Sequence, residues 1–200
     1  MNKKKPIILG LTGSIGMGKT TTAKMFSNRG IPVWDADKTV HQLYKNDKEM
    51  IRLFRRQIPH VVLNNQVSRN ALKKFLIENN ENLKKIEKIV HPIVAKERAK
   101  FLLAAVEKKI PLVVLDIPLL FETGNQTNVD YIVVVTVDAK TQKKRVLDRN
   151  TMSEEMFNSI LSKQISNKYK IEQADFIIST KTITKAQNEV DKIIAKFVGF

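Results

Sequence analysis

Short apolar runs alternate with amphipathic stretches along most of the chain, and this alternation predicts the fold. Nearly all-apolar runs, typical of strands covered on both faces, lie at 6–11, 31–34, 112–115, 131–135 and 176–178. Stretches with apolar residues at helical spacing lie at 19–29, 140–149, 153–164 and 184–197. Strands that alternate with helices predict an α/β protein with an open parallel sheet flanked by helices.

Residues 38–109 interrupt this alternation, because they carry only helical signals. Leu72, Phe75 and Leu76 fall at helical spacing, and His91-Pro92 has the form of a helix start. No stretch rich in Gly, Pro or Ser separates two domains. We therefore predict one domain, with a helical subdomain inserted into the α/β core.

The strongly basic charge balance indicates an anionic partner. The formal net charge of the 200 residues is +15, and residues 51–110 hold 14 basic and 5 acidic side chains. Nucleic acid and a phosphorylated small substrate both fit this excess. So does a simple codon bias, because lysine outnumbers arginine 27 to 8. Aromatic residues make up only 6% of the chain, which argues against a base-stacking surface.

Composition excludes several classes of protein. The chain contains no cysteine, so it has no disulfide framework, thiolate metal site or cysteine nucleophile. Its apolar runs are far shorter than the roughly 18–20 residues that span a bilayer. The first residues, 1–11, lack the long apolar region of a signal peptide. We expect a cytoplasmic protein with no membrane partner.

One glycine-rich segment carries a specific chemical signal. The run Gly13-Ser-Ile-Gly-Met-Gly18-Lys19-Thr20 matches the phosphate-loop pattern in full, after a predicted strand and before a predicted helix. Its backbone N–H groups and the helix N-terminus attract phosphate oxygens, and the lysine and threonine can meet the β- and γ-phosphates and Mg²⁺. The expected ATP-binding residues are Gly13, Ser14, Ile15, Gly16, Met17, Gly18, Lys19, Thr20 and Thr21. The pattern alone does not distinguish kinases, GTPases and motor ATPases.

Acidic residues follow two of the predicted strands. Asp116 ends an apolar strand, which is the form of a carboxylate that supports Mg²⁺ together with Thr20. Asp35 and Asp37 follow the second strand, whose end faces the ligand crevice of an open sheet. On an extended backbone both would face the site, where a carboxylate can orient an acceptor hydroxyl and take its proton. If Lys38 begins a helix, either aspartate can instead cap that helix.

Arg145 and Arg149 lie four residues apart on a predicted helix. Such a pair can neutralise charge that develops on a transferring phosphoryl group. A solvated basic helix face explains the same spacing equally well.

Taken together, these segments resemble the dephospho-CoA kinase family from the first strand to about residue 178. The resemblance rests on Gly10-Leu-Thr-Gly-Ser-Ile-Gly-Met-Gly-Lys-Thr-Thr21, Val33-Trp-Asp-Ala-Asp-Lys38, Val67-Ser-Arg69, Ile89-Val-His-Pro-Ile93, Asp116-Ile-Pro-Leu-Leu-Phe-Glu122, Arg145 with Arg149 and Met152-Ser153, Gln164, and Ala174-Asp-Phe-Ile-Ile178. The order of His-Pro-x-Ile and Pro-Leu-Leu-Phe-Glu is more specific than the phosphate loop. The resemblance implies ATP- and Mg²⁺-dependent phosphorylation of the 3′-hydroxyl of dephospho-CoA, the last step of coenzyme A synthesis.

The resemblance also implies roles for residues. Asp37 would be the base, Lys19 and Arg149 would stabilise the transferred phosphoryl group, and Arg145 would support them. The acceptor would be bound by Asp35, Arg69, His91, Pro92, Ile93, Pro118, Leu119, Leu120, Phe121 and Glu122. Within the single domain, the expected parts are a nucleotide-binding core (1–37, 110–139, 174–200), a helical CoA-binding subdomain (38–109) and a lid (140–173). The partner would be a small molecule rather than nucleic acid, and we favour a monomer over an oligomer.

Three positions depart from the family pattern. Ser14 replaces a usual glycine, Phe54-Arg55 replaces a Phe-Gly pair, and Thr180 stands where an asparagine is expected near the adenine. Two alternatives remain open: another small-molecule kinase, and an ATPase stimulated by nucleic acid. A GTPase is disfavoured, because no Asn-Lys-x-Asp sequence that would read guanine is present.

Overall fold

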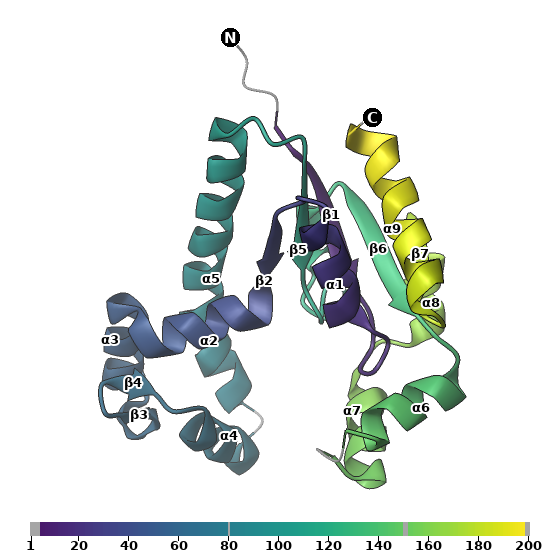
Figure 1. Cartoon of the computed structure of the whole chain (residues 1–200). Helices are drawn as coiled ribbons and strands as arrows, with labels where there is room; N and C mark the ends of the chain where they lie inside the picture. The colour runs from purple at the N-terminus through teal and green to yellow at the C-terminus, as the bar shows by residue number, and fades with distance from the viewer. Residues whose placement is uncertain (1–4, 80, 150–151, 199–200) are drawn as a thin grey trace. The chain divides into compact units, whose positions relative to one another are not determined.

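The computed structural model describes residues 5–79, 81–149 and 152–198, and the chain divides into two compact units (Figure 1). The first unit comprises Met1–Asp35 and Ala105–Phe200, and the second comprises Ala36–Ala104. The sequence-predicted boundaries of core, subdomain and lid stay predictions.

The first unit is built on a five-stranded parallel sheet, which confirms the predicted fold class. Its strands are β1 (Ile7–Thr12), β2 (Val33–Asp35), β5 (Leu112–Asp116), β6 (Tyr131–Thr136) and β7 (Phe176–Ser179). They are arranged in the order β2-β5-β1-β6-β7, and every neighbouring pair is parallel. All five residues of β5 are buried, as expected for a central strand covered on both faces. The loops that follow these strands therefore meet at one edge of the sheet.

Helices of the first unit bury the sheet and carry the loops of the site. They are α1 (Lys19–Asn28), α6 (Ala139–Leu147), α7 (Glu154–Lys163), α8 (Asn167–Glu172) and α9 (Ile183–Val198), with a short 3₁₀ turn, η2 (Asn125–Asn128). In Figure 1, α9 lies along β7, and both α1 and α9 contribute to the main apolar core. Phe26 from α1, Val190 from α9 and Leu9 from β1 are fully buried members of that core. The short helix α8 was missed in the sequence, because six residues leave little periodicity to detect.

The second unit is mainly helical and has its own apolar core. It contains α2 (Ala36–Asn46), α3 (Lys48–Gln57), η1 (Pro59–Val61), β3 (Val62–Leu63), β4 (Gln66–Val67), α4 (Arg69–Glu78) and most of α5 (Asn82–Glu107). Met50, Phe54 and Ile89 are among its buried core residues. No helix in the described part of the chain is both long enough and apolar enough to cross a membrane.

Two predictions for this region are wrong. It is not helical throughout, because β3 and β4 form a hairpin whose turn residues, Asn64 and Asn65, adopt left-handed backbone angles. Asparagine tolerates that conformation, so it favours a tight hairpin turn. Pro92 does not start a helix but lies inside α5. Its missing N–H costs one helical hydrogen bond, and burial of Ile89 and Ile93 on either side keeps the helix continuous.

Candidate active site

The phosphate loop joins the end of β1 to the start of α1. Gly18 caps α1 with φ +93°, and Gly16 has φ +79°, so both occupy the left-handed region that favours glycine. The N–H groups of the first helical turn have no partner within the helix, and they carry its partial positive charge. Lys19 and Thr20 are the first two residues of that turn. The loop and helix therefore have the backbone geometry of an anion-binding site, and the ATP-binding residues stay a prediction.

Two glutamines from distant segments hold this loop. The Gln142 side chain in α6 donates from Nε2 to the Ile15 carbonyl at 2.7 Å, and the Ile15 N–H donates to Gln164 Oε1 at 3.2 Å. Gln142 is buried. The sequence does not single out Gln142, because a lone glutamine in a basic helix gives no signal of its own. These contacts attach the predicted lid segment to the loop through α6 and through Gln164, the C-cap residue of α7.

Lys19 and Asp116 form an ion pair beside the loop. The Lys19 Nζ lies 2.5 Å from Asp116 Oδ1, and Asp116 is only 3% exposed. Asp116 is in register with Leu11 on one side and with Asp35 on the other. The structure therefore brings three predicted site residues, Lys19, Asp116 and Asp35, to the same edge of the sheet.

The oxygen groups at this edge suit a magnesium ion. Mg²⁺ prefers hard oxygen ligands and usually binds one or two protein groups together with substrate phosphates. The Thr20 hydroxyl is on the exposed first turn of α1, and the adjacent Lys19 reaches the Asp116 carboxylate. The predicted metal residues, Thr20 and Asp116, thus supply the oxygen donors that Mg²⁺ prefers.

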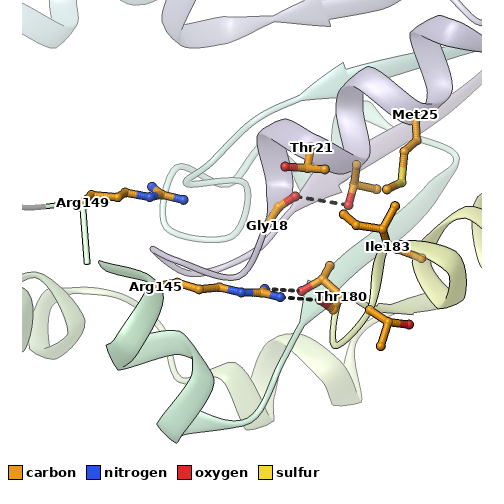
Figure 2. Close-up of a pocket in the computed structure, with 10 residues that line it drawn as sticks. Gly18, Thr21, Met25, Arg145, Arg149, Thr180 and Ile183 are labelled. Atoms are coloured by element: carbon orange, nitrogen blue, oxygen red, sulfur yellow. Dashed lines mark hydrogen bonds between the residues drawn. The ribbon is translucent and has the colours of Figure 1, made fainter. Parts of the chain in front are cut away.

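A cavity of about 280 Å³ lies beside α1 and the start of α9 (Figure 2). It is lined by Gly18, Thr21, Thr22, Met25, Arg145, Arg149, Thr180, Thr182, Ile183 and Ala186. The Arg145 guanidinium is held at its edge by Thr180, through Nη1 to Oγ1 at 3.0 Å and Nη2 to the carbonyl at 2.6 Å. The lining combines apolar side chains with two cations, which suits the base and phosphates of a nucleotide.

The expected pairing of Arg145 and Arg149 on one helix is wrong. Helix α6 ends at Leu147, and Arg149 lies beyond its C-cap residue, Asp148. An aspartate disfavours a helix C-terminus because of the helix dipole, and positions 149 and 150, which would continue the buried face of Gln142 and Val146, are arginine and asparagine. Both arginines nevertheless line the same cavity (Figure 2).

Asp35 and Asp37 do not share an extended backbone, so that expectation is also wrong. Asp35 is the last residue of β2, and α2 begins at Ala36. Asp37 lies in the first turn of α2 and is exposed. A carboxylate in a first turn interacts favourably with the helix N-terminus. The two carboxylates therefore have different local geometries and are not interchangeable.

The segment after Asp116 packs into the first unit. Leu120 and Phe121 are buried, Leu119 is 42% exposed, and the Pro118 carbonyl accepts a hydrogen bond from Thr12 at 3.0 Å. The Glu122 carboxylate lies inside the unit, where Oε1 is 2.8 Å from Lys170 Nζ. Oε1 also accepts the Ile165 N–H at 3.0 Å. Lys170 is completely buried, a partner that the sequence did not reveal.

We expect Glu122→Ala to lower the free energy of unfolding by about 3–5 kcal/mol, because it leaves the buried Lys170 ammonium without its carboxylate. Urea denaturation measures this loss. The double variant Glu122→Gln with Lys170→Met removes both charges, and we expect it to recover most of the stability. A single variant as stable as the wild type would show that the ion pair contributes nothing.

One predicted acceptor-binding residue of the second unit, Arg69, lines a cavity of that unit. The cavity has a volume of about 390 Å³ and is also lined by His41, Tyr44 and Lys45. Burial raises the pKa of the Tyr44 hydroxyl, and the nearby Arg69 charge opposes that rise. His41 Nδ1 is buried and has no hydrogen-bond partner among the described residues.

Three further predicted acceptor residues lie on α5 of this unit. His91 and Pro92 are exposed on the helix, whereas Ile93 belongs to the apolar core. The structure thus gives Ile93 a packing role and leaves His91 and Pro92 accessible.

The chain is similar to known proteins over most of its length. A family model described as dephospho-CoA kinase matches residues 7–185. Dephospho-CoA kinase from Ruegeria pomeroyi is 44% identical over 93% of both chains, and that from Bartonella quintana is 44% identical over 94% of this chain and 96% of the relative.

Solved structures show the same fold. TT1252 from Thermus thermophilus superposes with a TM-score of 0.84 at 30% identity, covering 96% of this chain and 98% of that one. Dephospho-CoA kinase from Campylobacter jejuni has a TM-score of 0.64 at 23% identity, covering 94% and 96%.

Proposed function

The chain belongs to the dephospho-CoA kinase family, and from this premise we propose that it transfers the γ-phosphoryl group of ATP to the ribose 3′-hydroxyl of dephospho-CoA. The products are coenzyme A and ADP, which makes this the last step of coenzyme A synthesis. The observation that carries the proposal is the complete phosphate loop with Lys19 paired to Asp116 in a chain of this family.

On the nucleotide side, we propose that the backbone N–H groups of the loop bind the phosphates. The base then enters the cavity beside Arg145 and Ile183. Lys19 exchanges its contact with Asp116 for the transferring phosphoryl oxygens, while Arg145 and Arg149 bring further positive charge. When bound by Thr20 and Asp116, Mg²⁺ would neutralise phosphate charge.

On the acceptor side, we propose that Asp37 orients the 3′-hydroxyl and accepts its proton. The oxygen–phosphorus bond to the acceptor forms as the bond between the γ-phosphorus and its bridging oxygen breaks, and ADP leaves. The reaction depends on positioning and charge neutralisation, because little covalent chemistry is left for the protein. A lid over 140–173 would exclude water and so suppress ATP hydrolysis.

The second unit offers a site for the anionic part of the acceptor. Residues 36–104 contain 15 lysines and arginines and 7 aspartates and glutamates. Three basic residues, His41, Lys45 and Arg69, line the 390 Å³ cavity, and none of its described lining residues is acidic. Dephospho-CoA carries a pyrophosphate, so we propose that this cavity receives it. The charge excess then requires no nucleic acid.

A direct assay tests the function. ADP release from Mg-ATP is measured with and without dephospho-CoA, and the product is weighed by mass spectrometry. We expect ADP release to require dephospho-CoA and the product to gain one phosphate. A panel of nucleosides, nucleoside monophosphates, DNA and RNA is the control. Stimulation by a member of that panel, with dephospho-CoA inactive, would favour one of the alternative functions.

A further inference from the structure

Thr180 connects three segments that are distant in the sequence. Its hydroxyl donates to the Met17 carbonyl of the phosphate loop at 2.7 Å and accepts from Arg145 Nη1 at 3.0 Å. Its N–H donates to the Thr136 carbonyl at the end of β6, at 2.8 Å. Thr180 is only 7% exposed, so these contacts are shielded from water. One residue therefore joins the loop, the sheet and the arginine.

The direction of these hydrogen bonds follows from the donor groups. A hydroxyl has a single proton, and it points to the Met17 carbonyl, which is closer than the Thr136 carbonyl at 3.3 Å. The guanidinium has only donors, so the hydroxyl oxygen accepts from it. The Thr180 carbonyl accepts the second bond, from Arg145 Nη2 at 2.6 Å. Two acceptors on one residue thus fix the plane of the guanidinium (Figure 2).

The Thr180 side chain packs closely against Gly18 of the phosphate loop. A Cβ atom placed on Gly18, the residue that caps α1, would lie 3.1 Å from Thr180 Oγ1. Thr180 therefore packs directly against the start of the helix that faces the nucleotide phosphates. Arg145 and Thr180 both line the cavity proposed for the nucleotide.

We propose that Thr180 is a positioning residue for ATP binding, which holds Arg145 in its binding orientation through both its hydroxyl and its carbonyl. Thr180 accepts from two of the five guanidinium N–H donors, and no other described residue accepts from Arg145, so we expect the remaining donors to meet the nucleotide. The proposal rests on the proposed function, since it assigns the 280 Å³ cavity to ATP. It also gives a role to a residue that stands where the family pattern leads us to expect asparagine.

The first test compares Thr180→Val with Thr180→Ser. Valine keeps the shape and the carbonyl but removes the hydroxyl, whereas serine keeps the hydroxyl. We expect Thr180→Val to raise both the Kd and the KM for ATP roughly tenfold, the scale of one lost hydrogen bond to a charged group. We expect Thr180→Ser to stay within roughly threefold of the wild type, and the KM for dephospho-CoA to stay unchanged in both. Ser179→Ala is the matched control, because it removes the neighbouring hydroxyl.

A double-mutant cycle separates positioning from a general structural role. In an Arg145→Met background, we expect Thr180→Val to cause no further loss of ATP binding. An equal loss in both backgrounds would show that Thr180 acts through Met17 and the loop alone, and the proposal would then be wrong. It would also be wrong if folded Thr180→Ser bound ATP as poorly as Thr180→Val.

A second variant covers the case in which Thr180→Val does not fold. Arg145→Lys keeps the charge but cannot donate from a planar fork to both acceptors, so it should show the same roughly tenfold loss. Wild-type ATP affinity in Arg145→Lys would contradict the proposal. Calorimetric titration with ATP needs no acceptor. An inactive wild type that binds ATP would therefore contradict the proposed function while the cycle still tests Thr180.

Discussion

Lys19→Ala is expected to lower kcat by roughly 10²-fold or more, the scale found when a group that stabilises transition-state charge is removed. The ammonium lies next to the first helical turn, within 2.5 Å of a carboxylate that ends the neighbouring strand. From this position we expect it to meet the oxygens of the transferring phosphoryl group and to stabilise their negative charge. We expect the KM for ATP to rise much less, because backbone N–H groups continue to bind the phosphates.

The stability of the Lys19 variant has to be measured beside its activity. Removing the ammonium takes a cation from Asp116, a carboxylate that is only 3% exposed, so the variant should also unfold at a lower temperature. Adding Asp116→Asn removes that charge and should restore the melting temperature without restoring kcat. Lys24→Ala, an exposed lysine on the same helix, is the matched control and should retain wild-type turnover. A near-normal kcat in folded Lys19→Ala would remove Lys19 from the chemistry.

The parts of the fold that the sequence predicted are those in which local pattern and tertiary burial agree. The run before Gly13 is apolar on both faces because β1 lies in the middle of the sheet, and the phosphate-loop pattern fixes where α1 begins. The hairpin around Asn64 was missed because its strands are two residues long, too short to show alternation. The expectation that Pro92 starts a helix is wrong because burial of the core residues around it outweighs the low helix propensity of proline.

In the candidate site too, residues of local patterns could be predicted, whereas contacts between distant positions could not. Lys19, Thr20 and Asp116 could be predicted, since each belongs to a local pattern whose chemistry requires that residue type. Gln142, Thr180 and the Glu122–Lys170 pair could not be assigned their partners. Their contacts join positions far apart in the chain, such as Ile15 with Gln142 and Met17 with Thr180. A single sequence contains no signal for such pairs. Thr180 was visible only as a departure from the family pattern, and its hydrogen bonds show what the departure does.

The phosphate loop depends both on its own local pattern and on contacts from distant segments. The local pattern supplies a backbone that can bind phosphate, but the loop is fixed by side chains from α6, α7 and the residue after β7. Preorganised donors stabilise developing charge only if they need not move during the reaction. We therefore expect these distant contacts to affect the rate of phosphoryl transfer as well as stability.

Asp37→Asn is expected to leave a folded protein whose kcat is lower by roughly 10²-fold or more, the scale of a lost general base. The amide has the size of the carboxylate but accepts no proton, so the 3′-hydroxyl would have to lose its proton to water. Asp37 is exposed in the first turn of α2, where the substitution disturbs no buried contact. Helical content and melting temperature should therefore stay close to the wild type.

Three measurements distinguish a base from a residue that only binds the acceptor. Quenched-flow single turnovers should show a slow chemical step in Asp37→Asn, while the Kd for ATP and the KM for dephospho-CoA change little. Glu49→Gln, an exposed carboxylate on α3 of the same unit, is the control and should be fully active. A loss confined to the KM for dephospho-CoA would make Asp37 a binding group. A wild-type single-turnover rate would assign proton acceptance elsewhere, with Asp35, the last residue of β2, as the next residue to test.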